Sequence, residues 1–297
     1  MIWLWGMQID DWMDNMKQIN KPLPWLMLWS LMLGVSTGSS ADNKYKAKSV
    51  DTPEVVGRLY LPTDHEQPVP AIIVLGGSGG RLNQVYAEQL AKAGFVVLAL
   101  AYFNAPGRSS TLDRVPVETV SQGIDWLLAQ PNVQTAGVGV LAVSRGTELA
   151  ILAAAHDPRI QAVAALVPSS VAWQGQRGSV AWTLGGEDVA TLTLPPAGDQ
   201  TTWQRAQRAL QTNQATQARL PVHMINGPIL LVSVEQDHIW PSTAMAEELM
   251  QQLSDHPHEH RHLVLDDDHT LSPESQAQLA QPLLTLFSQL AAESTSH

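Results

Sequence analysis

The sequence predicts an α/β protein with a mostly parallel central sheet and helices on both faces. From Val55 onward, short apolar runs alternate with amphipathic segments, which is the pattern of a parallel sheet whose strands are joined by helices. Several runs are almost wholly apolar, as expected of strands buried on both faces. The chain has 297 residues and is 44% apolar, which is enough for a large core.

The expected strands are Val55 to Leu61, Ala71 to Leu75, Phe95 to Ala101, Val138 to Val143, Ala162 to Val167, Ile229 to Val234 and His262 to Leu265. The expected helices are Asn83 to Ala93, Pro116 to Ala129, Arg145 to Ala155, Ser242 to Leu253 and Ser272 to Leu290. Gly94 is placed to end the first helix, and the alanines of the third helix would allow close packing on the sheet.

The alternation lapses between residues 168 and 227, where Gln, Thr, Gly and Trp are frequent. We expect a cap excursion over the carboxyl edge of the sheet, with one helix from Thr201 to Ala218. Trp173, Trp182 and Trp203 would either line an acyl pocket or only hold the excursion together. Both interpretations stay open on the sequence.

The N-terminal segment has the pattern of an export signal. Lys17 and Lys21 precede the apolar run Leu23 to Val35, and small residues end at Ala41. The run is shorter than the roughly 20 residues that span a bilayer, so we expect residues 1–41 to be a signal peptide cleaved after Ala41, giving a periplasmic or secreted protein. An amphipathic or membrane-anchoring helix is the alternative, and a chain without a signal would be cytoplasmic. Translation from Met16 rather than Met1 would also fit the pattern.

We expect residues 42–53 to be a linker, residues 54–292 to form one catalytic domain, and residues 293–297 to be a tail.

Charge and composition exclude several classes of protein. The net charge is −11 with 17 Lys and Arg residues, which argues against nucleic-acid binding. The chain has no cysteine, so disulfides, thiolate metal sites and a cysteine nucleophile are excluded. Four alternating histidines form a conceivable metal site, but a solvated loop is the favoured interpretation, and we expect no metal and no cofactor. They are His256, His258, His260 and His262.

The sharpest chemical signal is the segment Gly139 to Ala150, in which an apolar strand delivers Ser144 into a turn that opens a helix. This is the pattern of a nucleophile elbow, where small residues two before and two after the serine keep the helix and a neighbouring strand apart. Those residues are Ala142 and Gly146, with alanine in place of the usual glycine at the first. The alternative is that Ser144 only caps the helix. The elbow predicts an α/β-hydrolase fold.

In that fold the acid and the base follow later strands, in the order Ser, acid, His. Asp237 follows Ile229 to Val234, and His269 follows the strand ending at Leu265. We therefore expect His269 to take the proton of Ser144 and Asp237 to orient the imidazole. His238 is a rival base. Rival acids lie on the loop of His269 itself, where solvated or loop-capping roles are favoured; they are Asp266, Asp267 and Asp268.

An oxyanion needs two backbone donors, and we expect one to be the N–H of Arg145. The other would come from the loop Leu75 to Gly80, with Ser78 preferred and Gly77 as its neighbour. A phosphate-binding loop is disfavoured because the Lys-Ser/Thr ending of such loops is missing. Arg145 and Glu148 are spaced as an i,i+3 pair at the helix surface.

Six segments together resemble a known family, the C-terminal catalytic domain of acyl-CoA thioesterases and bile acid-CoA:amino acid N-acyltransferases. The likeness runs from about Glu54 to Leu286 and implies the same triad of Ser144, Asp237 and His269. In this family the transferases carry Cys at the nucleophile and the thioesterases carry Ser, so the resemblance implies hydrolysis of fatty acyl-CoA. The segments are Gly57 to Pro62, Leu75 to Gly80, Leu98 to Phe103, Val143 to Leu149, Asn226 to Leu231 and Gln236 to Trp240.

Three functions follow as hypotheses. The first is a serine hydrolase that cleaves acyl thioesters or esters, with a small-molecule substrate and no nucleic-acid or membrane-spanning partner after signal cleavage. The second is a periplasmic carboxylesterase of the dienelactone-hydrolase type. The third is a catalytically inactive binding protein, against which the presence of Ser, Asp and His at three strand ends argues.

Overall fold

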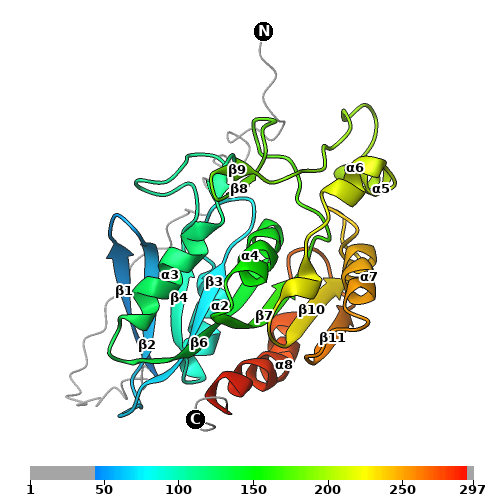
Figure 1. Ribbon diagram of the computed structural model, residues 1–297. Coiled ribbons are helices and arrows are strands. Elements are labelled where there is room, and N and C mark those ends of the chain that lie inside the picture. Colours follow the sequence, from blue (N-terminus) through cyan, green and yellow to red (C-terminus); the bar gives the residue numbers. More distant parts are fainter. Residues whose placement is uncertain (1–43, 293–297) are drawn as a thin grey trace, which may run out of the picture. The chain divides into compact units, whose positions relative to one another are not determined.

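The computed structural model describes residues 44–292, and its centre is an eight-stranded sheet (Figure 1). Two antiparallel strands form one edge, and the six that follow are parallel to one another. In spatial order the strands are β1 (Tyr45–Asp51), β2 (Val56–Pro62), β4 (Val96–Leu100), β3 (Val69–Leu75), β6 (Val133–Val143), β7 (Ile160–Leu166), β10 (Ile229–Val234) and β11 (His260–Leu265). The predicted mostly parallel sheet is confirmed.

Helices cover both faces of the sheet, because successive residues of a buried strand point to opposite sides. In β3, Ile73 and Leu75 pack into one apolar core, and Ile72 and Val74 pack into the other. The first core includes side chains of α3 (Glu118–Leu128), α4 (Arg145–His156) and α7 (Ser242–Gln252). The second includes side chains of α2 (Gln84–Lys92) and α8 (Pro273–Ala292), on the opposite face of the sheet.

Two predicted details of the helices are also found. Gly94, with φ of 101°, follows Ala93, the C-cap residue of α2, and ends the helix. Ala150, Ala153 and Ala154 of α4 are buried, so the helix lies close against the strands.

The excursion connects β7 to β10 and carries its own short elements, drawn above the central sheet in Figure 1. Its strand β8 pairs in parallel with β5, which precedes α3, and antiparallel with β9. The predicted single helix from Thr201 to Ala218 is two helices, because Thr212 has an extended backbone (φ −96°, ψ 158°). The partner strand β5 (Val115–Pro116) lies outside the excursion, whose own elements are β8 (Trp182–Leu184), β9 (Glu187–Asp188), α5 (Thr202–Leu210), α6 (Asn213–Gln217) and the 3₁₀ helix η2 (Val222–Met224).

The expected linker at residues 42–53 is wrong for most of its length, because Tyr45–Asp51 forms the edge strand β1. The strand alternates: Tyr45 and Ala47 pack against the second core, while Lys46 and Lys48 are exposed. Lysines on an edge strand discourage pairing with another chain.

The predicted signal peptide (residues 1–41) and the tail (293–297) lie outside the described residues. Between residues 44 and 292, the structure has no helix of the length and apolarity that crossing a membrane requires.

Candidate active site

Ser144 occupies a strained turn between β6 and α4. Its φ of 54° and ψ of −125° lie outside the regions that non-glycine residues normally adopt. Its side chain makes no capping hydrogen bond to the helix, so the helix-cap alternative is wrong. The hydroxyl of Thr147 donates to the Ser144 carbonyl at 2.6 Å and braces the turn.

The turn depends on small residues, as the sequence predicts. A Cβ atom at Gly146 would lie 2.3 Å from the carbonyl oxygen of Gly76. No side chain fits at that distance, so the helix can begin beside the loop after β3 only with glycine there. Ala142 is fully buried in β6, between β3 and β7.

Ser144, His269 and Asp237 form a hydrogen-bonded chain, although they come from three separate segments of the sequence. The Oγ atom of Ser144 lies 3.0 Å from Nε2 of His269, and Nδ1 of His269 lies 2.9 Å from Oδ2 of Asp237. These are the contacts that a serine nucleophile, its base and the orienting acid require.

Asp237 is held in its ionised form within a largely buried position. Burial disfavours the charge, but the hydrogen bond and the charge of His269, together with the backbone N–H of Trp240, outweigh it and lower the pKa of the carboxyl. The N–H groups of Ile239 and Trp240 lie 3.0 and 3.1 Å from Oδ1. The indole of Trp240 meets the imidazole of His269 edge to face, with ring centroids 5.6 Å apart, and fixes the ring plane.

The rival base His238 is paired with Asp268 through its Nδ1 atom and is largely exposed. The backbone N–H of His269 donates to the same carboxylate at 2.6 Å. Asp267 accepts from the N–H and the hydroxyl of Ser272 at 2.8 Å each, just before α8 begins.

Asp266 accepts from Nε2 of Gln236 at 2.6 Å, which links the His269 loop to the residues after β10. The three aspartates therefore hold the loop that presents His269, in agreement with the favoured loop-capping role.

The loop Leu75 to Gly80 runs beside Ser144. A Cβ atom at Gly77 would lie 3.3 Å from Cβ of Ser144. Four consecutive carbonyls of the loop accept hydrogen bonds from three side chains that come from elsewhere in the chain. The bonds are Tyr102 to Gly76 (2.7 Å) and Gly77 (3.1 Å), Gln176 to Ser78 (3.0 Å), and Asn104 to Gly79 (3.1 Å).

Because the carbonyls are engaged in this way, the N–H groups of the loop are available as donors. Within residues 44–292, the N–H groups of Gly77 and Ser78 have no hydrogen-bond partner. The N–H of Arg145 belongs to the first turn of α4, where no intrahelical acceptor exists. These three groups lie next to Ser144, and their role as oxyanion donors stays a prediction.

A cleft of about 320 Å³ opens at Ser144 and extends under the excursion. Trp173 lines the cleft, as the pocket interpretation predicts, whereas Trp182 and Trp203 are not among its lining residues. Trp182 is fully buried and holds the excursion instead. The lining residues are Ser78, Ser144, Arg145, Trp173, Gln174, Leu194, Thr202, Ala206, His238, Ile239, Trp240, His269 and Thr270.

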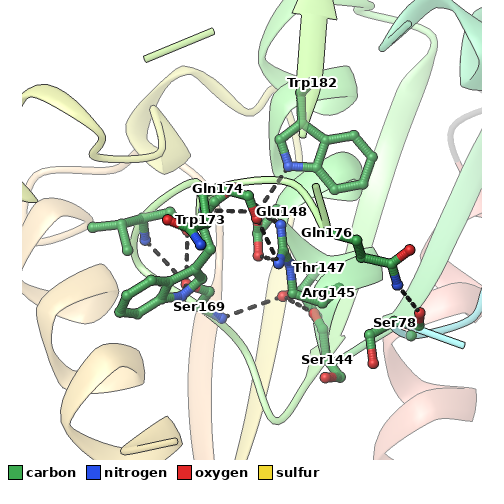
Figure 2. A network of polar contacts seen from close by, with 12 residues as sticks. Ser78, Ser144, Arg145, Thr147, Glu148, Ser169, Trp173, Gln174, Gln176 and Trp182 are labelled. Atoms are coloured by element: carbon green, nitrogen blue, oxygen red, sulfur yellow. Dashed lines mark hydrogen bonds and ion pairs between the residues drawn. The ribbon is translucent and has the colours of Figure 1, made fainter. Parts of the chain in front are cut away.

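The expectation that Arg145 and Glu148 form a surface pair is wrong. Nε of Arg145 lies 2.6 Å from Oε1 of Glu148, and the side chain of Glu148 is 0% exposed. The segment that covers it comes from the excursion and includes Trp173 and Trp182 (Figure 2).

The four alternating histidines make contacts with protein atoms. Each has a ring nitrogen within hydrogen-bond distance of an oxygen, with the shortest at 2.7 Å, between His262 and Ser233. The part of the chain that the structure describes holds no group of three or more His, Asp or Glu side chains arranged to bind a metal ion.

Sequence reasoning missed the side chains that support the site. Tyr102 lies within the apolar segment Leu98 to Phe103, and Gln176 lies in a polar stretch without a motif. Trp240 lies in the same segment as Asp237, Gln236 to Trp240, which is the one positional signal that could have pointed to it.

The strand order, the turn at Ser144 and the chain of hydrogen bonds to His269 and Asp237 define an α/β-hydrolase fold. In agreement, the structure resembles dienelactone hydrolase of Anabaena variabilis with a TM-score of 0.53 and 20% identity, covering 83% of this chain and 98% of that one.

The chain belongs to the family described as BAAT / Acyl-CoA thioester hydrolase C terminal, which residues 115–274 match. It is 29% identical over 213 residues to human acyl-coenzyme A thioesterase 1, covering 68% of this chain and 48% of the thioesterase. It is 27% identical over 250 residues to mouse acyl-coenzyme A amino acid N-acyltransferase 1, covering 83% of this chain and 56% of the transferase. The chain thus spans about half the length of these curated relatives.

The close approach of Gly146 and Gly76 gives the first prediction. Gly146→Ala should lower the free energy of unfolding by about 1–3 kcal/mol, because the added methyl group overlaps the Gly76 carbonyl. Urea denaturation measures this. Gly79→Ala is the matched control: a Cβ atom there meets nothing within 4 Å, so its effect should stay within about 0.5 kcal/mol. Equal effects of the two changes would contradict the argument.

Proposed function

We propose that this chain hydrolyses acyl thioesters or esters through a covalent acyl-serine at Ser144. The observation that carries the proposal is the hydrogen-bonded chain from Ser144 through His269 to Asp237. The family supports it, because human acyl-coenzyme A thioesterase 1 is among the relatives. A binding protein without activity would need none of these contacts.

In the first half-reaction, Ser144 Oγ attacks the acyl carbonyl carbon while His269 Nε2 takes the hydroxyl proton. The carbonyl oxygen becomes an oxyanion, which the N–H groups of Arg145 and of Gly77 or Ser78 would stabilise. When the intermediate collapses, the bond to sulfur or oxygen breaks. The leaving thiol or alcohol takes the proton from His269, and the acyl group stays on Ser144.

In the second half-reaction, His269 takes a proton from water and the hydroxide attacks the acyl-serine. The ester bond breaks, the proton returns to Ser144 Oγ, and the carboxylic acid leaves. Asp237 stays ionised throughout and stabilises the imidazolium, in keeping with its lowered pKa.

The acyl group would lie in the cleft beside Trp173, Ile239 and Trp240, whose side chains offer apolar surface. The volume of about 320 Å³ is at the small end of the range for ligand pockets, which favours short and medium acyl chains over long ones.

The charge of the cleft favours a second candidate, a carboxylesterase with an uncharged leaving group. Within residues 44–292, Arg145 is the one Lys or Arg that lines the cleft, and its guanidinium is paired with Glu148. A CoA leaving group carries several phosphate charges, which cationic side chains normally bind.

Covalent labelling tests the nucleophile. A fluorophosphonate probe should add to Ser144, and the adduct should be lost in Ser144→Ala and reduced at least about 100-fold in rate in His269→Ala, because the base is then missing. Peptide mass spectrometry locates the adduct. His238→Ala removes the rival base and should still label at Ser144, because His238 pairs with Asp268 whereas His269 contacts the serine hydroxyl. A folded protein that does not label would contradict the proposal.

A matched pair of substrates separates the two candidate functions. If the leaving group is uncharged, kcat/KM for 4-nitrophenyl octanoate should exceed that for octanoyl-CoA by about tenfold or more, because the described residues that line the cleft include no Lys or Arg without an acidic partner. Octanoyl-pantetheine, which has the same thioester without the nucleotide, is the control. A preference for octanoyl-CoA over octanoyl-pantetheine would favour the thioesterase instead.

Export stays a prediction from the sequence. If residues 1–41 are a signal peptide, the mature protein recovered from the periplasm or the medium should begin at Asp42, because Ala41 and Ser39 suit signal peptidase. N-terminal sequencing checks this. A mature chain that keeps the apolar run Leu23 to Val35 would contradict it.

A further inference from the structure

The side chain of Glu148 is a buried carboxylate in the first turn of the nucleophile helix, and its partners come from the excursion. Its Oε2 atom accepts from the indole N–H of Trp182 at 2.7 Å and from the backbone N–H of Trp173 at 3.1 Å. Figure 2 shows the carboxylate between these groups and the Arg145 guanidinium. One side chain therefore joins α4 to two points of the excursion.

Arg145 completes the attachment from the same turn of α4. Its guanidinium donates to the carbonyls of Trp173 and Gln174 at 3.0 and 3.1 Å. The N–H and the carbonyl of Trp173 are thus both fixed by the pair Arg145–Glu148. The indole of Trp173 is fixed separately, because it donates to Ser169 at 2.9 Å.

The segment held in this way is a wall of the cleft. Trp173 and Gln174 both line the cleft at Ser144. Two residues further on, Gln176 donates to the carbonyl of Ser78 in the loop beside the serine. The position of Glu148 relative to this segment therefore determines the shape of the cleft next to the reacting atoms.

We propose that Glu148 is a positioning residue that holds Trp173–Gln176 as the acyl-binding wall of the cleft and so sets the acyl chain that the site accepts. The inference rests on the proposed function, because it assigns the acyl group to this cleft. Glu148 acts through Trp173 and Gln174 and does not itself line the cleft.

Stability of the fold alone does not explain why the sequence has a glutamate at position 148. A buried carboxylate is expensive to desolvate, and burial raises the pKa of Glu148 in spite of its donors. The helix continues after Glu148 with the buried aliphatic residues Leu149 to Leu152. An apolar side chain at position 148 could not accept the hydrogen bonds from the N–H groups of Trp173 and Trp182.

The chain offers a matched control in Glu248 on α7. This carboxylate also ties the excursion to the core, because it accepts from Arg219 Nε and from Ser170 Oγ at 2.7 Å each. None of these three residues lines the cleft. Glu148→Gln and Glu248→Gln therefore make the same chemical change at two attachment points, of which one holds the wall.

The first experiment measures kcat and KM for 4-nitrophenyl acetate and octanoate. In Glu148→Gln, KM for the octanoate should rise about tenfold, because the amide NH₂ cannot replace the acceptor facing Arg145, while kcat/KM for the acetate should change less than about twofold. Glu248→Gln should change neither by more than about twofold. An equal loss for both esters, or an unchanged octanoate KM with only a lower melting temperature, would overturn the proposal.

Two further measurements cover other outcomes. If Glu148→Gln does not fold, Trp182→Phe removes one donor to the carboxylate and should raise the octanoate KM about threefold without affecting the acetate. Octanoate binding to Ser144→Ala, followed by tryptophan fluorescence, needs no catalysis. Adding Glu148→Gln should weaken that binding about tenfold and adding Glu248→Gln should not.

The two proposals can fail separately. If the wild type hydrolyses no ester but octanoate binding still distinguishes Glu148→Gln from Glu248→Gln, the proposed function is wrong. The proposal that Glu148 positions the acyl-binding wall is then still supported. If the wild type is active and neither measurement distinguishes the two variants, Glu148 has only a structural role.

Discussion

The site depends on a single close contact between two backbones. The carbonyl of Gly76 occupies the space that a side chain at Gly146 would need, so α4 starts directly against the loop that follows β3. This contact places the first turn of α4, which carries the N–H of Arg145, beside the loop Leu75 to Gly80. The strained backbone of Ser144 persists because the flanking strand β6 is buried between β3 and β7.

The excursion is the second determinant, and it does more than cover the sheet. It supplies one wall of the cleft, and through Gln176 it supplies a hydrogen bond to the loop beside Ser144. The core supplies the serine, the histidine and the aspartate from the ends of three parallel strands. The shape of the cleft therefore depends on how the excursion is placed against the core. The buried pair Arg145–Glu148 lies where the two meet.

The sequence predicted what is encoded locally. Apolar runs identified the buried strands, and the small residues around Ser144 identified the turn. Asp237 and His269 could be found because each follows a strand, and the carboxyl ends of parallel strands meet at one edge of the sheet. The edge strand β1 was missed because alternating lysines make it look like a polar connection.

What the sequence could not predict depends on distant contacts. The spacing of Arg145 and Glu148 is the same whether the pair is exposed or buried, and only the arrival of Trp173 and Trp182 decides between the two. Tyr102, Asn104 and Gln176 hold the loop from two other parts of the chain, and nothing near them in the sequence marks that role. Long-range hydrogen bonds between side chains and backbone leave no periodic pattern to read.

The buried carboxylate at Glu148 also limits how this chain can evolve. Replacing Trp182 with a residue that has no donor would leave the carboxylate short of a partner, and replacing Glu148 alone with an apolar residue would leave Nε of Arg145 and the N–H groups of Trp173 and Trp182 without their acceptor. Either single step is unfavourable, whereas changing the positions together removes donors and acceptors at once. Positions 145, 148 and 182 should therefore be inherited as a set, so that related chains divide into those that keep all three polar groups and those that have lost them together.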